Sequence, residues 1–147
     1  MSDRQGVLLI GGNGFLGAAL ARKLAAAGRE VHVLSRHLEP GAREGIQFHR
    51  GGQDDVVVVS PLLRTCSTVV HLASTTTPGS SARNPVVDIQ ENLLPAARLL
   101  ETMADMPPER LIFVSSGGAI YGNPDELPVS EADQPNPLSF HAAGKIA

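Results

Sequence analysis

Short apolar runs recur along the chain and are separated by longer segments with helical spacing. Runs of four or five mainly apolar residues, closed by glycine or polar residues, are typical of strands in a largely buried parallel sheet. We therefore predict five strands, at residues 7–10, 31–34, 46–49, 68–72 and 111–115.

The segments between these runs predict helices and loops. Leucines recur at helical spacing within residues 15–27, and Gly28 follows where a C-cap glycine belongs. Val56 to Val59 suits a strand by propensity. The rhythm of a parallel sheet requires a crossover before the fourth strand, so we favour instead a short helix within 54–65, with Ser60-Pro61 as its N-cap and first residue. Further along we predict a polar loop at 74–85, a long helix at 86–103 kinked by Pro95, a loop at 122–137, and a helix starting near Leu138.

Strands that alternate with helices predict an α/β fold with a doubly wound parallel sheet. Right-handed crossovers give this Rossmann sheet the strand order 3-2-1-4-5. No composition shift marks an internal boundary, so we expect residues 1–147 to form one domain.

Composition narrows the function classes. The net charge is −3 and the basic residues are scattered, which argues against nucleic acid as a partner. The apolar runs are too short to span or enter a membrane as a helix. The single cysteine, Cys66, excludes an internal disulfide framework, and we expect it to be a buried small residue. These features fit a cytoplasmic domain.

A glycine-rich turn follows the first predicted strand and opens the first helix. Gly11 permits a tight turn, Gly14 lacks the side chain that would block a pyrophosphate, and Gly17 lets the helix lie close to the sheet. The free N–H groups and the dipole of the helix N-terminus favour phosphates. This strand–turn–helix context predicts a dinucleotide-binding site.

The end of the second predicted strand bears on the choice of cofactor. An acid there would bind the ribose 2′-hydroxyl of NAD, but this chain has Ser35 and Arg36 instead. An arginine beside a hydroxyl suits a 2′-phosphate, so NADP is favoured slightly over NAD. Alternatively, Arg36 is an exposed loop arginine, since His37 and Arg43 are also close by in the sequence.

Three motifs together resemble the extended short-chain dehydrogenase/reductases, and more narrowly their nucleotide-sugar epimerase/dehydratase branch. They are Gly-Gly-Asn-Gly-Phe-Leu-Gly at 11–17, His-Leu-Ala-Ser at 71–74, and Phe-Val-Ser-Ser-Gly-Gly-Ala-Ile-Tyr-Gly at 113–122. With the lysine near the end of the chain, the resemblance covers essentially all of it. It implies an NAD(P)-dependent enzyme that oxidises a nucleotide-sugar transiently by hydride transfer, and a possible homodimer.

The resemblance also implies roles for individual residues. Gly11, Gly14, Phe15 and Leu16 would line the cofactor pyrophosphate. The segment Leu72, Ala73 and Ser74 would run beside the cofactor's ribose and nicotinamide. Ser116 would bind the reacting hydroxyl, and Lys145 would bind the nicotinamide ribose.

The family's acid/base tyrosine, four residues before the lysine, is replaced by His141. Three interpretations of His141 are open. It is a substitute base, since a neutral imidazole is available near neutral pH. Alternatively, the catalytic role is lost, or His141 is a surface residue on a frayed final turn. Loss of the role is slightly favoured, because imidazole is shorter than phenol. The alternative function is therefore a non-catalytic dinucleotide-binding module, such as a redox sensor or an assembly partner.

Further departures concern recognition and length. Gly52 stands where the family has an aspartate that reaches adenine, and Asp54 is a possible substitute. Gly117 stands where many members have a serine or threonine. Members continue into a substrate lobe, so we expect a chain truncated before that lobe, with the edge of the fifth strand unpaired and negligible turnover of its own.

Overall fold

The computed structural model describes residues 4–37 and 44–147, and it separates into two compact parts. The first part comprises the residues up to 73 together with 95–114, and the second comprises 74–94 and 115–147. Whether they act as the single domain expected above stays a prediction.

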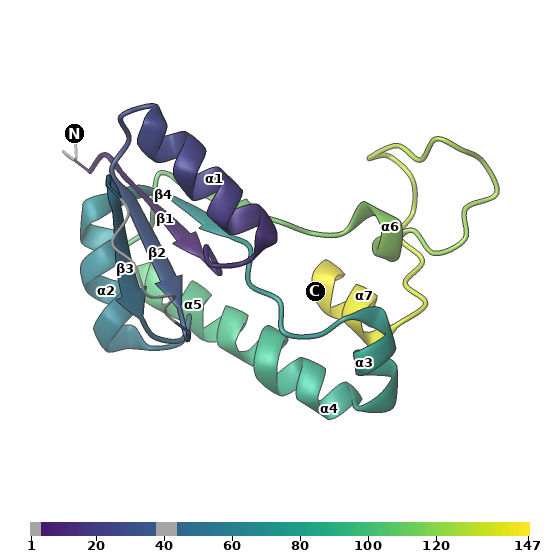
Figure 1. Ribbon diagram of the computed structural model, residues 1–147. Helices are drawn as coiled ribbons and strands as arrows, with labels where there is room; N and C mark the ends of the chain where they lie inside the picture. The colour runs from purple at the N-terminus through teal and green to yellow at the C-terminus, as the bar shows by residue number, and fades with distance from the viewer. Residues whose placement is uncertain (1–3, 38–43) are drawn as a thin grey trace. The chain divides into compact units, whose positions relative to one another are not determined.

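The first part is built on a sheet of five parallel strands (Figure 1). They are β1 (Gly6–Ile10), β2 (Val31–Ser35), β3 (Ile46–Arg50), β4 (Cys66–His71) and β5 (Arg110–Phe113). Their order is β3-β2-β1-β4-β5, with β1 pairing in parallel with both β2 and β4. The predicted fold class and strand order are confirmed.

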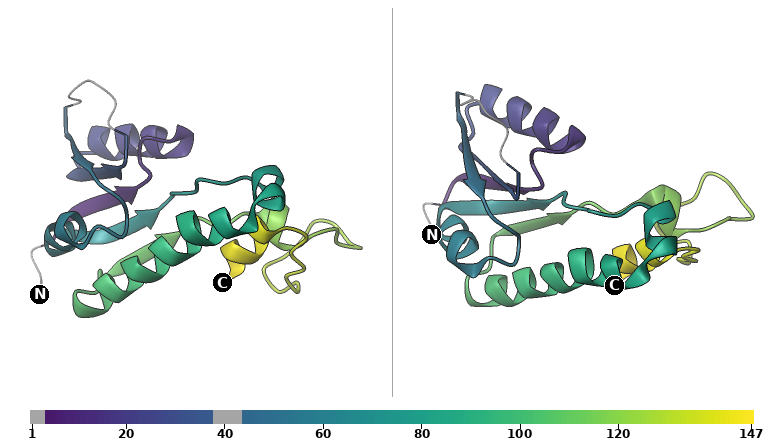
Figure 2. Two further views of the ribbon diagram at one scale, coloured as in Figure 1. Left: turned by 90° about the horizontal axis from the view of Figure 1, so that it is seen from below. Right: turned by 60° about the horizontal axis from the view of Figure 1, so that its bottom comes forward.

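Helices cover both faces of this sheet (Figures 1 and 2). Helix α1 (Phe15–Ala26) lies on one face, and α2 (Val56–Thr65) and α5 (Leu94–Asp105) lie on the other. Alternate residues of β1 serve the two cores, with Val7 and Leu9 facing α1. Leu8 and Ile10 pack with residues of α2 and α5. Burial on both faces explains why this strand is continuously apolar.

Cys66 belongs to the core on the α2 and α5 face and is fully buried. Burial raises the pKa of its thiol to about 12, with a further contribution from the nearby charge of Glu30. The thiol is therefore protonated at neutral pH and is a poor nucleophile. The expectation of a buried structural cysteine is confirmed.

Helix α2 begins earlier than the Ser60-Pro61 pair predicts. Its N-cap is Asp55, whose carboxylate accepts a hydrogen bond from the Val58 amide at 3.4 Å. The predicted cap at Ser60 is wrong, and Pro61 lies inside the helix. Pro61 has no N–H to donate to the Val57 carbonyl, four residues earlier. Pro61 lies on the exposed side of α2, and Val57 is itself 84% exposed.

The second part contains short helices and a long loop. Its elements are α3 (Pro78–Arg83), α4 (Pro85–Asp88), the π-helical turn η1 (Ile89–Leu93), α6 (Gly117–Ile120) and α7 (Phe140–Ile146). Residues 122–137 form neither helix nor strand, and α7 begins after the N-cap Ser139. Both features agree with the predicted loop and final helix.

The prediction of a continuous loop at 74–85 is wrong, because α3 forms within it. Thr77 and Ser80 form a reciprocal capping box, and Pro78 occupies the first turn. These features satisfy the free N–H groups of the first turn and preset its backbone, so a short polar segment becomes helical. The long helix predicted at 86–103 is present as α4, η1 and α5 in succession. Its irregularity is the π-helical turn η1, which ends at Leu93, two residues before Pro95.

Strand β5 forms one edge of the sheet, as predicted for the last strand. All four of its residues are exposed, and three are apolar: Leu111, Ile112 and Phe113, at 41–45% exposure. The other strands at the centre of the sheet are buried. Within the described residues, no further strand pairs with β5.

Candidate functional site

The glycine turn joins the carboxyl end of β1 to α1 and is pressed against neighbouring backbone. Gly11 has a φ of +80°, and a Cβ there would lie 2.8 Å from the backbone nitrogen of Ala73. Its own N–H donates to the Leu34 carbonyl at 2.9 Å. Glycine is therefore required at position 11 both by conformation and by the segment that follows β4.

Two further glycines are required by packing. A Cβ at Gly17 would lie 2.5 Å from the Cα of Gly12 and 2.7 Å from the Gly11 carbonyl oxygen. Gly17 thus lets α1 approach the turn itself, a more specific contact than the predicted approach to the sheet. A Cβ at Gly12 would lie 2.9 Å from a methyl group of Val33, a requirement that the sequence analysis missed.

Gly14 differs from these glycines because the protein leaves space beside it. A Cβ there would meet only the Gly11 carbonyl oxygen, at 3.4 Å, which is an ordinary van der Waals distance. Its φ of −68° is one that any residue adopts. Neither the fold nor the backbone conformation explains this glycine. Glycine at such a position is typical of turns where a ligand approaches the backbone closely.

The N-terminus of α1 is suited to an anion. Its N-cap is Gly14, no side chain caps it, and its first turn holds no acidic residue. Phe15 is 92% exposed and Leu16 is 60% exposed, so the predicted lining residues are on the surface. Uncapped N–H groups and the positive end of the helix dipole lie at the carboxyl edge of a parallel sheet, where dinucleotide phosphates bind in this fold.

Ser35 ends β2, and Arg36 follows it as an exposed residue. The Ser35 hydroxyl oxygen accepts a hydrogen bond from the His37 amide at 3.3 Å, which leaves the hydroxyl proton available to a ligand. Asn13 in the glycine turn donates its side-chain amide to the His37 carbonyl, so the turn and the end of β2 are joined. Arg43 lies outside the described residues.

The segment after β4 lies beside the turn. The Leu72 amide donates to the Ile10 carbonyl at 2.9 Å, and Ala73 contacts Gly11 as described above. His71 is buried, bonds to the side-chain oxygen of Gln53 and stacks on Phe113. His71 is therefore a structural core residue. The roles of Leu72 and Ala73 beside a cofactor stay predictions.

Asp54 already has a partner within the first part. Its carboxylate lies 3.5 Å from the guanidinium of Arg98, and its other carboxylate oxygen lies close to where a side chain at Gly52 would begin. The pair is partly exposed, so its net stabilisation is small. Recognition of adenine by Asp54 stays a prediction.

The catalytic candidates belong to the second part. Ser116 is the N-cap of α6 and is half-buried, and the neighbouring Ser115 hydroxyl donates to the Lys145 carbonyl at 3.3 Å. This bond brings the start of α6 to the end of α7. Burial lowers the pKa of Lys145, and the negative charge of Asp88 partly opposes that shift. Ser74 donates its hydroxyl to the Thr76 carbonyl.

His141 is buried, at 9% exposure, so its interpretation as a surface residue on a frayed turn is wrong. Its backbone N–H donates to the Ser81 hydroxyl at 3.1 Å, which anchors the start of α7 on α3. Its Nδ1 lies 3.3 Å from the Thr76 hydroxyl oxygen and 4.0 Å from a carboxylate oxygen of Asp88. The imidazole is therefore held in a built polar environment.

The partners of this histidine were not among the residues predicted from the sequence. Thr76, Asp88 and Asn92 form a hydrogen-bonded cluster, and Asp88 is only 3% exposed. The available signal was an aspartate and an asparagine four residues apart, which lie on one face of a helix. A carboxylate on a face that must be buried requires partners, and that requirement predicts a polar cluster.

Other features of residues 4–37 and 44–147 offer no competing site. A cavity lined by Arg4, Glu30, Arg64 and Met106, among others, lies at the amino ends of the strands, away from the glycine turn. No three metal-ligating side chains gather in this described part. None of its helices is long and apolar enough to cross a bilayer.

The sequence pattern of the NAD dependent epimerase/dehydratase family matches residues 7–147. The chain belongs to this family. A putative UDP-glucose 4-epimerase of Methanocaldococcus jannaschii is 32% identical over 144 residues, covering 95% of this chain and 47% of that protein. The UDP-glucose 4-epimerase of Lactobacillus helveticus is also 32% identical, covering 95% of this chain and 44% of its own length. The chain thus spans about half the length of these relatives.

Solved structures of family members share the fold. The Thermus thermophilus UDP-glucose 4-epimerase in complex with NAD is 37% identical with a TM-score of 0.83, covering 95% of this chain and 47% of that one. MoeE5 in complex with UDP-glucuronic acid and NAD is 30% identical with a TM-score of 0.85, covering 96% and 46%. The sheet in the first part of the chain is therefore a Rossmann sheet of the epimerase type.

Substitution of two glycines by alanine separates fold from ligand binding in this epimerase-type turn. Gly17→Ala places its methyl group against backbone that cannot move aside, so we expect the free energy of unfolding to fall by about 1–3 kcal/mol or more. Gly14→Ala meets open space, so the change should be within about 1 kcal/mol. Urea unfolding of both variants measures the difference. Equal destabilisation by the two would show that Gly14 is also structural.

Proposed function

We propose that this chain binds NAD(P) at the glycine turn as the cofactor-binding part of a nucleotide-sugar epimerase/dehydratase. The main support for this proposal is the space beside Gly14, which the protein's own fold does not use. The uncapped N-terminus of α1 supplies the complementary N–H groups. Gly11, Gly14, Phe15 and Leu16 would line the pyrophosphate, and Gly17 would let α1 lie close enough to present its N-terminus to it.

Relatives support the chemical class of both ligands. The structures of the Thermus thermophilus enzyme and MoeE5 contain NAD, and MoeE5 was also solved with UDP-glucose. The Thermotoga maritima UDP-glucose 4-epimerase, 30% identical with a TM-score of 0.83, was solved with UDP-glucose. A nucleotide-sugar is therefore the substrate class we propose for the longer protein. A homodimer stays a prediction.

The bound nicotinamide supplies a hydride acceptor that can return the hydride. The chain's own residues must then hold the sugar hydroxyl and accept its proton. Ser116 would donate a hydrogen bond to that hydroxyl, and His141 would accept its proton. Lys145 would hold the nicotinamide ribose, and its cationic form would favour developing negative charge. Leu72, Ala73 and Ser74 would line the cofactor's ribose and nicotinamide.

The preference for NADP rests on Arg36. It follows β2 directly and is exposed, and the adjacent Ser35 retains a hydroxyl proton to donate. A guanidinium binds a 2′-phosphate through charge-assisted hydrogen bonds. The Thermus thermophilus enzyme and MoeE5 were solved with NAD, so the preference is a property we propose for this chain and not one carried over from them.

Calorimetric titration of the chain with NADP⁺ and with NAD⁺ tests the cofactor proposal. We expect binding of both, with NADP⁺ the tighter. Arg36→Ala should weaken NADP⁺ binding by roughly tenfold or more, the equivalent of one charged hydrogen bond, and leave NAD⁺ binding unchanged. Arg83→Ala, an exposed arginine on α3, is the matched control. Tighter NAD⁺ binding, unaffected by Arg36→Ala, would overturn the preference.

The alternative, a non-catalytic binding module, differs in what position 141 does. In a protein that carries this chain with the remaining half found in its relatives, we expect conversion between UDP-glucose and its 4-epimer. His141→Gln should lower kcat by about 10²–10⁴-fold, since general-base catalysis contributes that much. If the native protein is inactive and His141→Tyr creates activity, the binding-module function is the correct one.

A further inference from the structure

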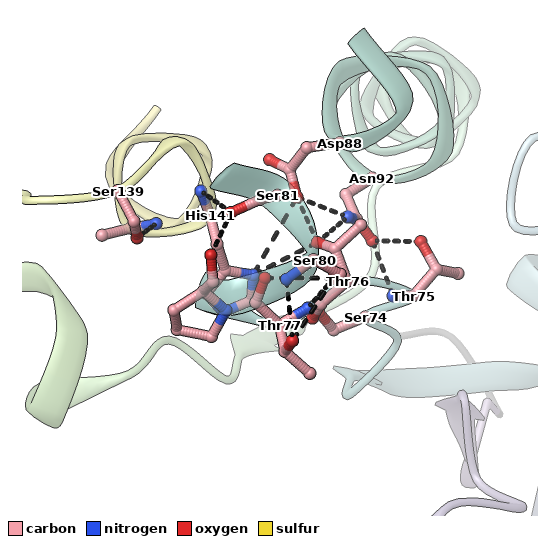
Figure 3. Close-up of polar contacts among 12 residues, drawn as sticks. Ser74, Thr75, Thr76, Thr77, Ser80, Ser81, Asp88, Asn92, Ser139 and His141 are labelled. Atoms are coloured by element: carbon pink, nitrogen blue, oxygen red, sulfur yellow. Dashed lines mark hydrogen bonds and ion pairs between the residues drawn. The ribbon is translucent and has the colours of Figure 1, made fainter. Parts of the chain in front are cut away.

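A chain of hydrogen bonds links Asp88 to His141 through the hydroxyl of Thr76 (Figure 3). Asp88 comes from α4, Asn92 from η1, and His141 from α7, while Thr76 precedes α3. Asp88, Thr76 and His141 are each at least about nine-tenths buried, at 3%, 9% and 9% exposure. The four side chains converge on one point in Figure 3.

The Thr76 hydroxyl has one proton to donate, and its contacts determine where that proton goes. Its oxygen lies in hydrogen-bond contact with Asp88 Oδ1, and a carboxylate can only accept. The side-chain amide of Asn92 donates to both Thr76, at 2.8 Å, and Asp88, at 3.0 Å. The orientation of the Asn92 side chain is fixed, because its Oδ1 accepts hydrogen bonds from the backbone amide and the hydroxyl of Thr75, at 2.9 and 3.0 Å.

With its proton directed to Asp88, the Thr76 oxygen can only accept from the imidazole, 3.3 Å away. The atom facing it is His141 Nδ1, which must therefore carry a proton. In a neutral imidazole the proton then resides on Nδ1, and Nε2 has the lone pair. In the described residues no hydrogen bond joins Nε2 to another side chain or to the backbone.

We propose that Thr76 and Asp88 are positioning residues that hold His141 in its Nδ1–H tautomer and so make Nε2 its proton-accepting atom. The inference deepens the proposed function, in which His141 stands where the family has its acid/base tyrosine. A tyrosine has a single phenolic oxygen that can exchange the proton, whereas a histidine has two ring nitrogens. An imidazole presents the correct nitrogen only if its second nitrogen is bonded, as with the carboxylate partner of a catalytic histidine.

Anchors on either side of the imidazole keep the arrangement rigid. The backbone N–H of His141 donates to Ser81, which is fully buried, and the Ser81 hydroxyl donates to the Pro78 carbonyl. A Cβ at Gly144, one turn further along α7, would lie 3.1 Å from Asp88 Oδ2. The absence of a side chain there lets α7 approach the carboxylate closely.

The tautomer is measured directly by long-range ¹⁵N–¹H correlation spectroscopy of the histidine-labelled chain. The pH is raised until the histidine ¹⁵N signals no longer change, so that the neutral forms are observed. Loss of one signal set in His141→Gln assigns the His141 resonances among the five histidines. We expect native His141 to show the Nδ1–H pattern. An Nε2–H pattern, or an average of the two forms, overturns the proposal.

Variants at position 76 test the bridge. Thr76→Ser keeps the hydroxyl and should keep the Nδ1–H pattern, whereas Thr76→Val keeps the shape and should lose it. Thr75→Val is the matched control, because its hydroxyl contacts Asn92 and not His141, and should leave the Nδ1–H pattern in place. A folded Thr76→Val that retains the pattern would show that Thr76 does not act as the bridge.

Asp88→Asn provides a second route if Thr76→Val does not fold. An amide at 88 can donate to the Thr76 oxygen, which frees the hydroxyl proton for His141 Nδ1, so the Nε2–H form should appear. No change in the tautomer would remove Asp88 from the proposal. The measurement uses the chain without cofactor or substrate. The tautomer proposal and the cofactor proposal can therefore fail separately, the latter by absence of binding in the calorimetric titration.

Discussion

At the carboxyl end of β1, the backbone of the segment after β4 lies where a side chain at Gly11 would begin, 2.8 Å from that Cβ position. The same crowding recurs between Gly17 and Gly12, so the end of β1, the start of α1 and the segment after β4 meet through backbone at the glycine turn. This close packing places the N-terminus of α1 at the edge of the sheet, with Gly14 facing space that the protein does not fill. This arrangement supports the pyrophosphate site that we propose.

The strands and their order could be predicted because β1 is apolar at every position and is buried on both faces. Helix boundaries were harder to predict where side-chain capping interactions compete with residue propensity. Asp55 caps α2 ahead of Ser60, and the Thr77–Ser80 capping box turns a Thr/Ser/Pro segment helical. Both signals are present in the sequence, but each depends on side-chain geometry that periodicity does not express.

The candidate site divides in the same way. Gly11, Gly14 and Gly17 could be identified from spacing, since each is a local requirement of the strand–turn–helix unit. Burial of His141 and its link through Thr76 to Asp88 could not, because residues 65 positions apart in the chain meet only after folding. The replacement of a phenol by an imidazole explains why such partners matter: the ring needs one nitrogen bonded for the other to act.

Amide chemical-shift mapping with NAD⁺ tests whether the glycine turn binds a dinucleotide. The backbone amide signals of residues 11–17 and of Leu72 and Ala73 should shift on titration of the ¹⁵N-labelled chain. Gly14→Ala should abolish those shifts, while the variant's spectrum remains that of a folded protein. Shifts confined to other residues, or shifts at the turn that survive Gly14→Ala, would contradict the account.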